Sequence, residues 1–531
     1  MKYNDYLWWH KGVIYQVYPR SYKDSDQDGV GDLRGIIEKL DYLKELGVDA
    51  VWVSPIYPSP MADFGYDVSD YTGIHPLFGN MGDFDDLLKE VHEREMKLIL
   101  DLVPNHSSNE HPWFRESRSS KDNPKRDWYI WKDPAPDGGP PNNWLSVFGG
   151  PGWEYDEATG QYYYHAFLKE QPDLNWRNPE VQKAMLDVMR FWLEKGVDGF
   201  RVDVMWHMVK DDQFRDDPPN PDYNDKMNSY SRKIPAFSTD QDEVHDIVHK
   251  MRRVIDDYDE RLLIGEIYLP ISKLVRYYGE DNRGAHLPFN FQLLQLPWDA
   301  AKIEAAISEY EGALPEHGWP NWVLGNHDNS RIASRVGKEQ ARVAAMLLLS
   351  LRGTPTIYYG DELGMEDVEI PKEKIQDPQA LNEPGVGRSR DPERTPMQWD
   401  DSKNAGFTTG EPWLPLMENY RELNVEKQWS KEGSMLQLHR KLLELRAKEP
   451  ALHIGKYNPV PSNGNLLAYL REYEQEKFLI VLNLGASEEI FEPEFQWQGT
   501  VKIATHTELE GEKLNQKITI AANQGLLIKL D

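Results

Sequence analysis

Three acidic residues stand at the ends of short apolar stretches that look like buried strands. Asp203 and Glu266 lie near the ends of GFRVDV and LLIGEI, and Asp328 follows NWVLGN within the motif GNHD. A carboxylate beside a buried strand costs free energy unless it has a partner or a task. One such acid alone is more often a salt-bridge partner, but its recurrence on successive strands predicts a cluster of acids that carries chemistry.

Two of these acids have surroundings that suit different roles. Arg201 stands two residues before Asp203, so both side chains leave a strand on the same face and the guanidinium can keep Asp203 ionised. Glu266 has apolar neighbours, Ile264 and Ile267, of the kind that raise a carboxyl pKa. An ionised carboxylate beside a protonated acid is the arrangement that retaining glycoside hydrolysis requires.

The stretch DSDQDGVGDL at 24–33 resembles the start of a calcium-binding loop. An EF-hand that begins at Asp24 needs a Glu at its twelfth position, and Gly35 stands there, which excludes a calcium sensor of that kind. A single structural metal site remains the prediction, and an acidic surface turn is the alternative. The candidate side-chain ligands are Asp24, Asp26, Asp28 and Asp32.

The elements that must position these acids repeat along the chain. An amphipathic helical pattern at 33–46 ends at Gly47 and leads into the apolar run AVWVSP, and the same order returns at 181–204 around Gly196. Such alternation predicts a parallel sheet covered by helices, and eight strands close a (β/α)8 TIM barrel. The expected strands are 13–17, 50–55, 97–103, 199–204, 262–267, 286–291, 321–326 and 354–360.

Two further domains accompany the predicted α/β barrel. Residues 105–175, rich in Trp, Pro, Gly and Asn, are too long for a loop and predict an excursion domain inserted after the third strand. Alternating polar and apolar residues in 453–531 predict a C-terminal antiparallel β-sandwich. The barrel itself would comprise 1–104 and 176–452, with an irregular interval at about 365–432.

The composition narrows the partners. The net charge of −29 over 531 residues, without a basic run, argues against nucleic acid and anionic membranes as partners. The sequence has no cysteine, no secretory leader pattern and no run of eighteen apolar residues, so we expect a cytoplasmic protein. Aromatic residues make up 11% of the chain; they fill cores, and they also form the stacking faces of carbohydrate sites.

Five ordered motifs carry a resemblance to a known family. Four of them are similar to the signature regions of the α-amylase family of glycoside hydrolases, and the fifth, QPDLN at 171–175, resembles the form found in its oligo-1,6-glucosidase and α-glucosidase branch. The likeness extends from IYQVYPRS to RTPMQW at 394–399. The four signature motifs are DLVPNH at 101–106, GFRVDV at 199–204, IGEI at 264–267 and GNHD at 325–328.

The resemblance implies a role for each acid. Asp203 would be the nucleophile that forms a β-glucosyl enzyme, Glu266 the general acid and then base, and Asp328 the stabiliser of the transition state. The nucleophile and the acid would lie about 5 to 5.5 Å apart. His106 and His327 would bind hydroxyls of the glucose that is cleaved, and Arg201 would orient Asp203.

The resemblance also implies a site closed to one glucose unit. Asp63 and Arg394 would form a charged clamp at the blocked end, and Tyr66 would be a stacking platform. Phe148 and Phe167 would be aromatic walls, although core packing explains either one equally well. Such an enzyme releases glucose from chain ends and does not cut internally.

In the same branch, the loop after the first strand resembles 24–33 and holds one divalent ion. That ion is commonly calcium, with Mg²⁺ as the alternative, and Val30 would add its carbonyl oxygen to the four carboxylates. No organic cofactor is implied.

Linkage preference is implied by the residue after the nucleophile. Val204 at that position favours α-1,6 bonds, as in isomaltose, over α-1,4 bonds. The segment after Asp328 reads NSR where the branch usually has QPR, which leaves linkage and acceptor choice open. The stretch at 206–223 also resembles α-glucosidases that act on trehalose.

Two other functions remain as alternatives. A transglucosylase or sucrose isomerase of the same fold would share every catalytic residue, and only product analysis separates it from a hydrolase. A non-catalytic accessory protein of an amino-acid transporter is a more distant alternative, because such proteins have a membrane anchor and usually lack the acids. The expected partner is a small oligosaccharide or disaccharide, and the oligomeric state is left open.

Overall fold

The computed structural model describes residues 3–386 and 388–531, and its centre is a parallel sheet of eight strands. Their order around the sheet is β10-β11-β1-β2-β3-β7-β8-β9. All eight predicted strands are present, each shorter than the apolar run that predicted it. Their bounds are β1 (Ile14–Val17), β2 (Ala50–Val53), β3 (Lys97–Leu102), β7 (Gly199–Val202), β8 (Leu262–Gly265), β9 (Leu287–Pro288), β10 (Asn321–Val323) and β11 (Thr354–Tyr358).

Hydrogen bonds of the Asn321 side chain link the two ends of this sheet. The backbone ladder runs from β10 round to β9, and no ladder joins β9 to β10 among the described residues. There the Asn321 amide donates to the Pro288 carbonyl, and its oxygen accepts from the Asn290 N–H at 2.9 Å. The barrel is therefore nearly closed by the backbone and completed by one buried amide. Apolar side chains fill the interior, among them Ile14, Trp52, Ile99, Ile264, Leu287 and Val323.

Helices surround the barrel as the sequence pattern predicts. The predicted helix at 33–46 divides at Lys39 into α3 (Leu33–Glu38) and α4 (Leu40–Leu46). Gly47 and Gly196 end α4 and α7 with φ of 98° and 108°, a left-handed conformation that glycine adopts without strain. The longer helices of the set are α5 (Met81–Glu93), α7 (Pro179–Lys195), α8 (Val244–Asp256), α11 (Ala300–Ala313), α13 (Lys338–Ser350) and α16 (Met435–Lys448).

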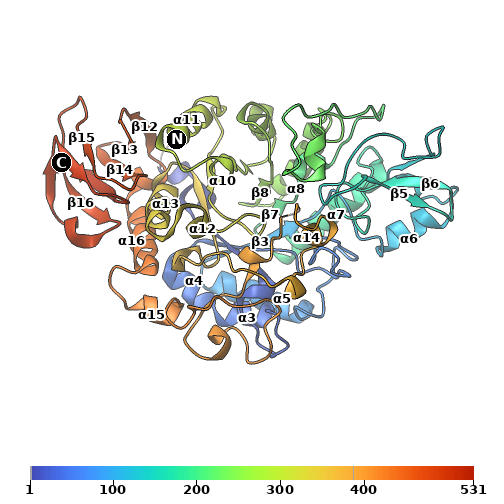
Figure 1. Cartoon of the computed structure of the whole chain (residues 1–531), viewed down its shortest axis with the longest axis horizontal. Helices are drawn as coiled ribbons and strands as arrows, with labels where there is room; N and C mark the ends of the chain where they lie inside the picture. Colours follow the sequence, from blue (N-terminus) through green and yellow to red (C-terminus); the bar gives the residue numbers. More distant parts are fainter. Residues whose placement is uncertain (1–2, 387) are drawn as a thin grey trace.

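The excursion between β3 and α7 carries its own small sheet. Helix α6 (Pro112–Ser119) precedes three antiparallel strands in the order β4-β6-β5, namely β4 (Trp131–Lys132), β5 (Trp153–Asp156) and β6 (Gln161–Tyr164). Figure 1 shows this part on the opposite side of the barrel from the C-terminal strands. A backbone hydrogen bond joins the two ends of the excursion: the Leu174 N–H donates to the Asn105 carbonyl at 2.9 Å.

A second irregular segment follows β7, and the sequence analysis did not assign it a place. Residues 205–243 contain two 3-10 turns, Met205–His207 and Ser229–Arg232, before α8 begins. This segment, called the β7–α8 segment below, packs on the excursion. The Trp144 indole donates to the Arg215 carbonyl at 2.8 Å, and Asn143 exchanges hydrogen bonds with Asp217. The two irregular parts therefore support each other above the barrel.

The C-terminal part is an antiparallel sandwich, as predicted. A six-stranded sheet, in the order β12-β13-β14-β19-β16-β17, and a two-stranded sheet of β15 and β18 enclose an apolar cluster that includes Phe491, Val481 and Ile528. The strands are β12 (Lys456–Val460), β13 (Leu466–Tyr473), β14 (Glu476–Asn483), β15 (Glu489–Phe491), β16 (Gln498–Ala504), β17 (Lys513–Asn515), β18 (Ile518–Ile520) and β19 (Gly525–Leu530).

Two buried arginines join this sandwich to the barrel. Arg471 on β13 donates to the carbonyls of Ser350, Leu452 (2.8 Å) and Gly455 (3.0 Å). Arg446 on α16 donates to the carbonyls of residues 349, 351, 353 and 452. The carbonyls of 349–351 close the end of barrel helix α13, so the guanidinium groups bind the helix terminus that needs donors.

Among the described residues, no helix combines the length and the apolar character needed to cross a bilayer.

Replacing Arg471 tests this docking. Arg471→Met would leave buried carbonyls without donors, so we expect the free energy of unfolding to fall by about 2 to 4 kcal/mol. Urea unfolding followed by tryptophan fluorescence measures this change. Because Arg471 lies far from the strand ends that carry the acids, kcat at 25 °C should stay near the parent value. A stability loss below about 0.5 kcal/mol, as is usual for surface changes, would contradict the docking role.

Candidate active site

A cavity of about 610 Å³ opens at the carboxyl ends of the barrel strands. The three predicted acids line it, together with residues from the excursion and from the β7–α8 segment. The lining comprises Asp63, Tyr66, His106, Val147, Phe148, Phe167, Gln171, Asp203, Val204, Trp206, His207, Tyr230, Ile234, Pro235, Ala236, Thr239, Asp240, Glu266, Tyr268, Leu269, Pro270, Lys273, Asp328, Asn329, Gln379 and Arg390.

One arginine lies under three carboxylates at the floor of this cavity. Arg201, fully buried on β7, contacts Asp101, Asp203 and Glu266, each at 2.8 Å. Asp101 is the direct neighbour of Arg201 in the register of β3 and β7, and Glu266 follows β8 on the other side. The barrel therefore brings acids from three adjacent strands onto one guanidinium.

This sharing decides the protonation of the acids. Burial raises the pKa of Asp203 well above its usual range; Arg201 opposes the rise, whereas Glu266 and Asp101 add to it. Burial also raises the pKa of Glu266. Arg201 was expected to keep Asp203 ionised. Its guanidinium contacts three acids, so its charge alone does not offset the effect of burial on the pKa of Asp203. The charges of Asp101, Asp203 and Glu266 act on one another around Arg201, so the protonation of each acid depends on that of the others.

Asp328 has the opposite surroundings. Arg394 contacts it at 2.8 Å, Arg390 at 3.4 Å and His327 at 3.3 Å. Burial alone would raise the pKa of Asp328, but these cations and His327 outweigh it and lower the pKa below its usual value. Asp328 is therefore the acid of the cluster that stays ionised.

Val204 holds a strained backbone next to these acids. Its φ is +36°, a left-handed conformation that a β-branched residue avoids. In that conformation its N–H donates to Glu266 Oε2 at 2.8 Å. The turn therefore fixes Glu266, which single-sequence reasoning did not anticipate.

Of the two predicted histidines, His106 lines the cavity, whereas His327 lies outside the lining and contacts Asp328. The Tyr66 hydroxyl is 2.6 Å from His327 Nε2, and Gln16 is 2.8 Å from the other nitrogen of that ring. His106 lies below Phe167, with its ring centroid 5.2 Å away. Burial lowers the pKa of His106 to about 4 and that of His327 well below 6.5, so both rings are neutral at neutral pH.

The charged clamp has a different arginine from the one predicted. Asp63 pairs with Arg390 at 2.7 Å, and Arg390 also pairs with Asp377. Arg394 is turned instead to Asp328 and the His327 carbonyl, where it is fully buried and does not line the cavity. The predicted Asp63–Arg394 pair is therefore wrong, because the turn at 392–394 points Arg394 inward.

The aromatic walls lie where the sequence placed them. Phe148 and Phe167 both line the cavity, with ring centroids 5.6 Å apart. The Arg390 guanidinium lies over the Phe148 ring at 4.8 Å.

Several residues of the site escaped the sequence analysis. Asp101 opens the motif DLVPNH and Gln171 opens QPDLN, so the motifs contained a signal that was read only at other positions. Gln171 donates to Asp63 at 3.2 Å. The residues of the β7–α8 segment that line the cavity, such as Tyr230 and Ile234, belong to no motif and are brought in by the fold alone.

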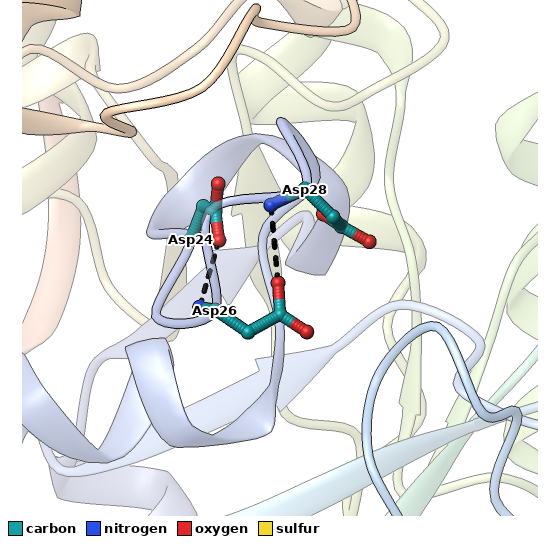
Figure 2. A group of neighbouring side chains, drawn as sticks. All are labelled: Asp24, Asp26 and Asp28. Carbon is teal, nitrogen blue, oxygen red and sulfur yellow. Dashed lines mark hydrogen bonds between the residues drawn. The ribbon is translucent and has the colours of Figure 1, made fainter.

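The acidic loop gathers three of its predicted ligands. Oxygens of Asp24, Asp26 and Asp28 lie within 4.8 Å of one another. Figure 2 shows them on one turn, where the Asp26 N–H donates to Asp24 at 3.0 Å and the Asp28 N–H to Asp26 at 3.2 Å. Burial raises the pKa of Asp28, and the neighbouring carboxylates add to the rise. Such a group of oxygens fits a hard divalent cation.

Asp32 lies outside this group of three, and its place among the predicted ligands stays a prediction. Its two oxygens accept hydrogen bonds from the Ser25 hydroxyl, the Ser25 N–H and the Gly35 N–H, so it caps α3. The metal role of the Val30 carbonyl stays a prediction; the Val30 N–H donates to Asp28 at 2.8 Å.

Comparison with known proteins identifies the family. The sequence model described as the catalytic domain of alpha amylase matches residues 16–455. The chain belongs to the α-amylase family. It is 42% identical over 523 aligned positions to an oligo-1,6-glucosidase of Parageobacillus thermoglucosidasius, with 91% of this chain and 92% of the relative covered. It is 38% identical to a trehalose-6-phosphate hydrolase of Bacillus subtilis (strain 168), with 100% and 99% covered.

Solved structures of α-amylase family enzymes share the whole architecture. The alpha-glucosyl transfer enzyme XgtA superimposes with a TM-score of 0.93 at 39% identity, with 99% of this chain and 100% of that chain covered. The trehalulose synthase MutB of Pseudomonas mesoacidophila MX-45 gives 0.91 at 36% identity, with 99% of each chain covered. The protein is an enzyme that hydrolyses glycosidic bonds, an exo-acting α-glucosidase of the α-amylase family.

The shared guanidinium predicts how stability depends on pH. A carboxyl whose folded pKa is raised destabilises the fold as pH rises above its unfolded value of about 4, because the buried group must then ionise. Asp203→Asn removes this cost, so we expect the midpoint of thermal unfolding to rise on the order of 2 °C at pH 8. The gain should shrink toward pH 5. Scanning calorimetry at both pH values measures it, and a lower midpoint for the variant at pH 8 would contradict the raised pKa.

Proposed function

We propose that the enzyme releases glucose from the non-reducing end of short α-glucosides by a retaining double displacement, with Asp203, Glu266 and Asp328 as its catalytic residues. The observation that carries this proposal is the placement of Asp203 and Glu266 on one guanidinium at the cavity floor, beside an ionised Asp328. The predicted separation of about 5 to 5.5 Å between the first two carboxyl groups belongs to the proposal.

In this mechanism Asp203 and Glu266 have different roles once the sugar has bound. Glu266 donates its carboxyl proton to the glycosidic oxygen while Asp203 attacks the anomeric carbon. The C1–O bond breaks and a glucosyl ester of Asp203 forms. Glu266, now ionised, then takes a proton from water, whose oxygen attacks C1 and releases Asp203. Asp328 stays charged throughout and favours the positive charge that develops on the sugar ring.

The end of the cavity supports the release of single glucose units. The buried ion pair of Asp63 and Arg390 lies against Phe148 at one end, and His106 and Tyr66 line the cavity beside it. These groups would bind the hydroxyls and the ring face of one glucose. A polysaccharide chain could not continue past the ion pair.

The preferred linkage is proposed as α-1,6, with α-1,4 and trehalose as lesser substrates. Val204 lines the cavity directly after Asp203 and lies against Glu266 through its N–H, where the leaving group must pass. The relatives named oligo-1,6-glucosidase support this preference. A neutral small oligosaccharide is the proposed substrate, and the cysteine-free composition supports a cytoplasmic location.

We also propose that the acidic loop binds one structural divalent cation, calcium in preference to Mg²⁺. Asp24, Asp26 and Asp28 would hold it, with the Val30 carbonyl as a further ligand. The loop lies outside the residues that line the cavity, so the ion would stabilise the turn and take no part in bond cleavage.

Glucose release from isomaltose, maltose, trehalose and sucrose tests the function. We expect isomaltose to give the highest kcat/KM and Asp203→Asn to lose about 10⁴-fold or more, as expected when a covalent nucleophile is removed. A coupled glucose assay with NMR of the first-formed anomer measures both rate and retention.

Val204→Thr is the matched variant for linkage, since it keeps the branched shape and adds a hydroxyl. Its ratio of maltose to isomaltose activity should rise. Activity of Asp203→Asn near the parent value, or a first product with inverted configuration, would exclude the mechanism. Sugar isomers in place of free glucose would favour the sucrose isomerase alternative.

Removal of the proposed cation should destabilise the enzyme. Calcium at 100 times its dissociation constant would stabilise the fold by about 2.7 kcal/mol, so EDTA should lower the unfolding midpoint and added calcium should restore it. Asp26→Asn with Asp28→Asn should abolish the response, whereas a change of the exposed Asp41→Asn should not. An unfolding midpoint that is identical with EDTA and with calcium would contradict the site.

A further inference from the structure

Lys210 is a charged residue that the mechanism does not use, although it is buried close to the acid cluster. It lies in the β7–α8 segment with 2% of its surface exposed. Its ammonium group forms an ion pair with Asp173 of the excursion and donates to Asn105 Oδ1 at 2.7 Å. Burying this charge costs free energy, so we expect its contacts to have a specific structural role.

The orientation of the Asn105 amide follows from these contacts. An ammonium group only donates, so the Asn105 atom that faces Lys210 must be the oxygen. The amide nitrogen then faces Asp173, which only accepts when ionised, at 2.9 Å. Lys210 and Asp173 therefore define the two ends of the amide independently, and both give the same orientation.

This orientation in turn determines the tautomer of His106. The Asn105 amide nitrogen lies 3.1 Å from His106 Nδ1, so that ring nitrogen must accept and carries no proton. In the neutral ring the proton is then on Nε2, which lies 3.1 Å from the Tyr66 carbonyl, an acceptor. Gln171 also approaches Nε2 with its amide nitrogen at 3.1 Å, which favours the other tautomer. Two contacts outweigh this one, because the opposite tautomer would leave both Asn105 and Tyr66 mismatched.

We infer that the buried pair of Lys210 and Asp173 is a positioning device that, through Asn105, keeps His106 in the Nε2–H tautomer, so that the N–H directed at the Tyr66 carbonyl is a donor that a sugar hydroxyl can share. His106 is 1% exposed and Asn105 is fully buried, so bulk water cannot supply the missing partners if the amide turns. The inference rests on the proposed function only in assigning sugar contact to His106. The low pKa of His106 is consistent with it, since burial and the Lys210 charge keep the ring neutral.

The device also links three parts of the chain that are distant in sequence. Asn105 ends the loop after β3, Asp173 lies in the excursion, and Lys210 lies in the β7–α8 segment. His106 therefore receives its working tautomer only when all three parts have docked.

Selective ¹⁵N labelling of histidine tests the inference on the parent enzyme, and one variant serves only to assign the signal. His106, assigned by its loss in His106→Gln, should show a non-protonated Nδ1 and a protonated Nε2 at pH 7 in two-bond ¹H–¹⁵N spectra. A protonated Nδ1 in the parent enzyme would overturn the inference. This measurement involves no substrate, so its result does not depend on the proposed function.

An exchange of the two acceptors provides the functional test. The double variant Asn105→Asp with Asp173→Asn keeps the net charge and nearly the same shape, but it places an acceptor against His106 Nδ1. We expect Nδ1 to become protonated and kcat/KM on the best sugar to fall about tenfold or more, the cost of one lost hydrogen bond. Asp173→Asn alone is the matched control: Lys210 still orients Asn105, so the tautomer should not change.

Two results of this exchange would overturn the inference. One is an unchanged tautomer in the double variant; the other is a reversed tautomer with kcat/KM equal to that of the control. Circular dichroism shows whether each variant is folded, and if the double variant is unfolded, the spectrum of the parent enzyme decides alone. Asp222→Asn, at an exposed aspartate of the β7–α8 segment, controls for the negative charge that Asp173→Asn removes and should leave both the tautomer and kcat/KM unchanged.

Discussion

The contact of one guanidinium with three carboxylates is the constraint on which the site depends. Arg201 can reach Asp101, Asp203 and Glu266 because β3, β7 and β8 are neighbours in register and their carboxyl ends meet at one edge. One positive charge cannot neutralise three buried negative ones, so the cluster must bind protons. A retaining glycosidase needs one acid protonated and its neighbour able to attack, and burial of Glu266 and Asp203 favours the proton that the first requirement calls for.

The rest of the cavity has the opposite balance. Arg390 and Arg394 both contact Asp328 and keep that acid ionised, whereas burial raises the pKa of Asp63 although Arg390 pairs with it. The two sides lie within one cavity and differ in how many cations each acid has. Chemically similar acids therefore differ in protonation because they contact different numbers of cations. The strained turn at Val204 holds Glu266 in place through a hydrogen bond from its N–H.

The sequence predicts the strands, helices and domains of this protein better than it predicts which side chains pair with one another. Helices and strands follow from local periodicity, and the acids follow from motifs at strand ends, so the barrel, the sandwich and the three carboxylates were all predictable. The partner of Asp63 was not, because Arg390 and Arg394 are one helical turn apart and only the backbone direction at 392–394 decides which one faces the cavity. Asp32 was predicted as a metal ligand because of its residue type; it also caps α3 by accepting from the Gly35 N–H, a contact that the acidic spacing alone does not indicate. The β7–α8 segment has no periodicity, so its place in the wall depends on contacts with the excursion that no local pattern contains.

The docking of the C-terminal sandwich has a consequence for synthesis on the ribosome. Arg471 binds the carbonyl of Ser350 at the end of α13, and near the other terminus Tyr3 lies against Tyr473, with ring centroids 6.5 Å apart. A chain emerging from the exit tunnel completes the last barrel strand more than a hundred residues before these partners appear. Arg446, which is made first, binds the carbonyls of Leu349 and Leu351, but the carbonyl of Ser350 gains its arginine only when β13 has been made. The order of synthesis therefore leaves one bond at the end of α13 to a strand of the sandwich.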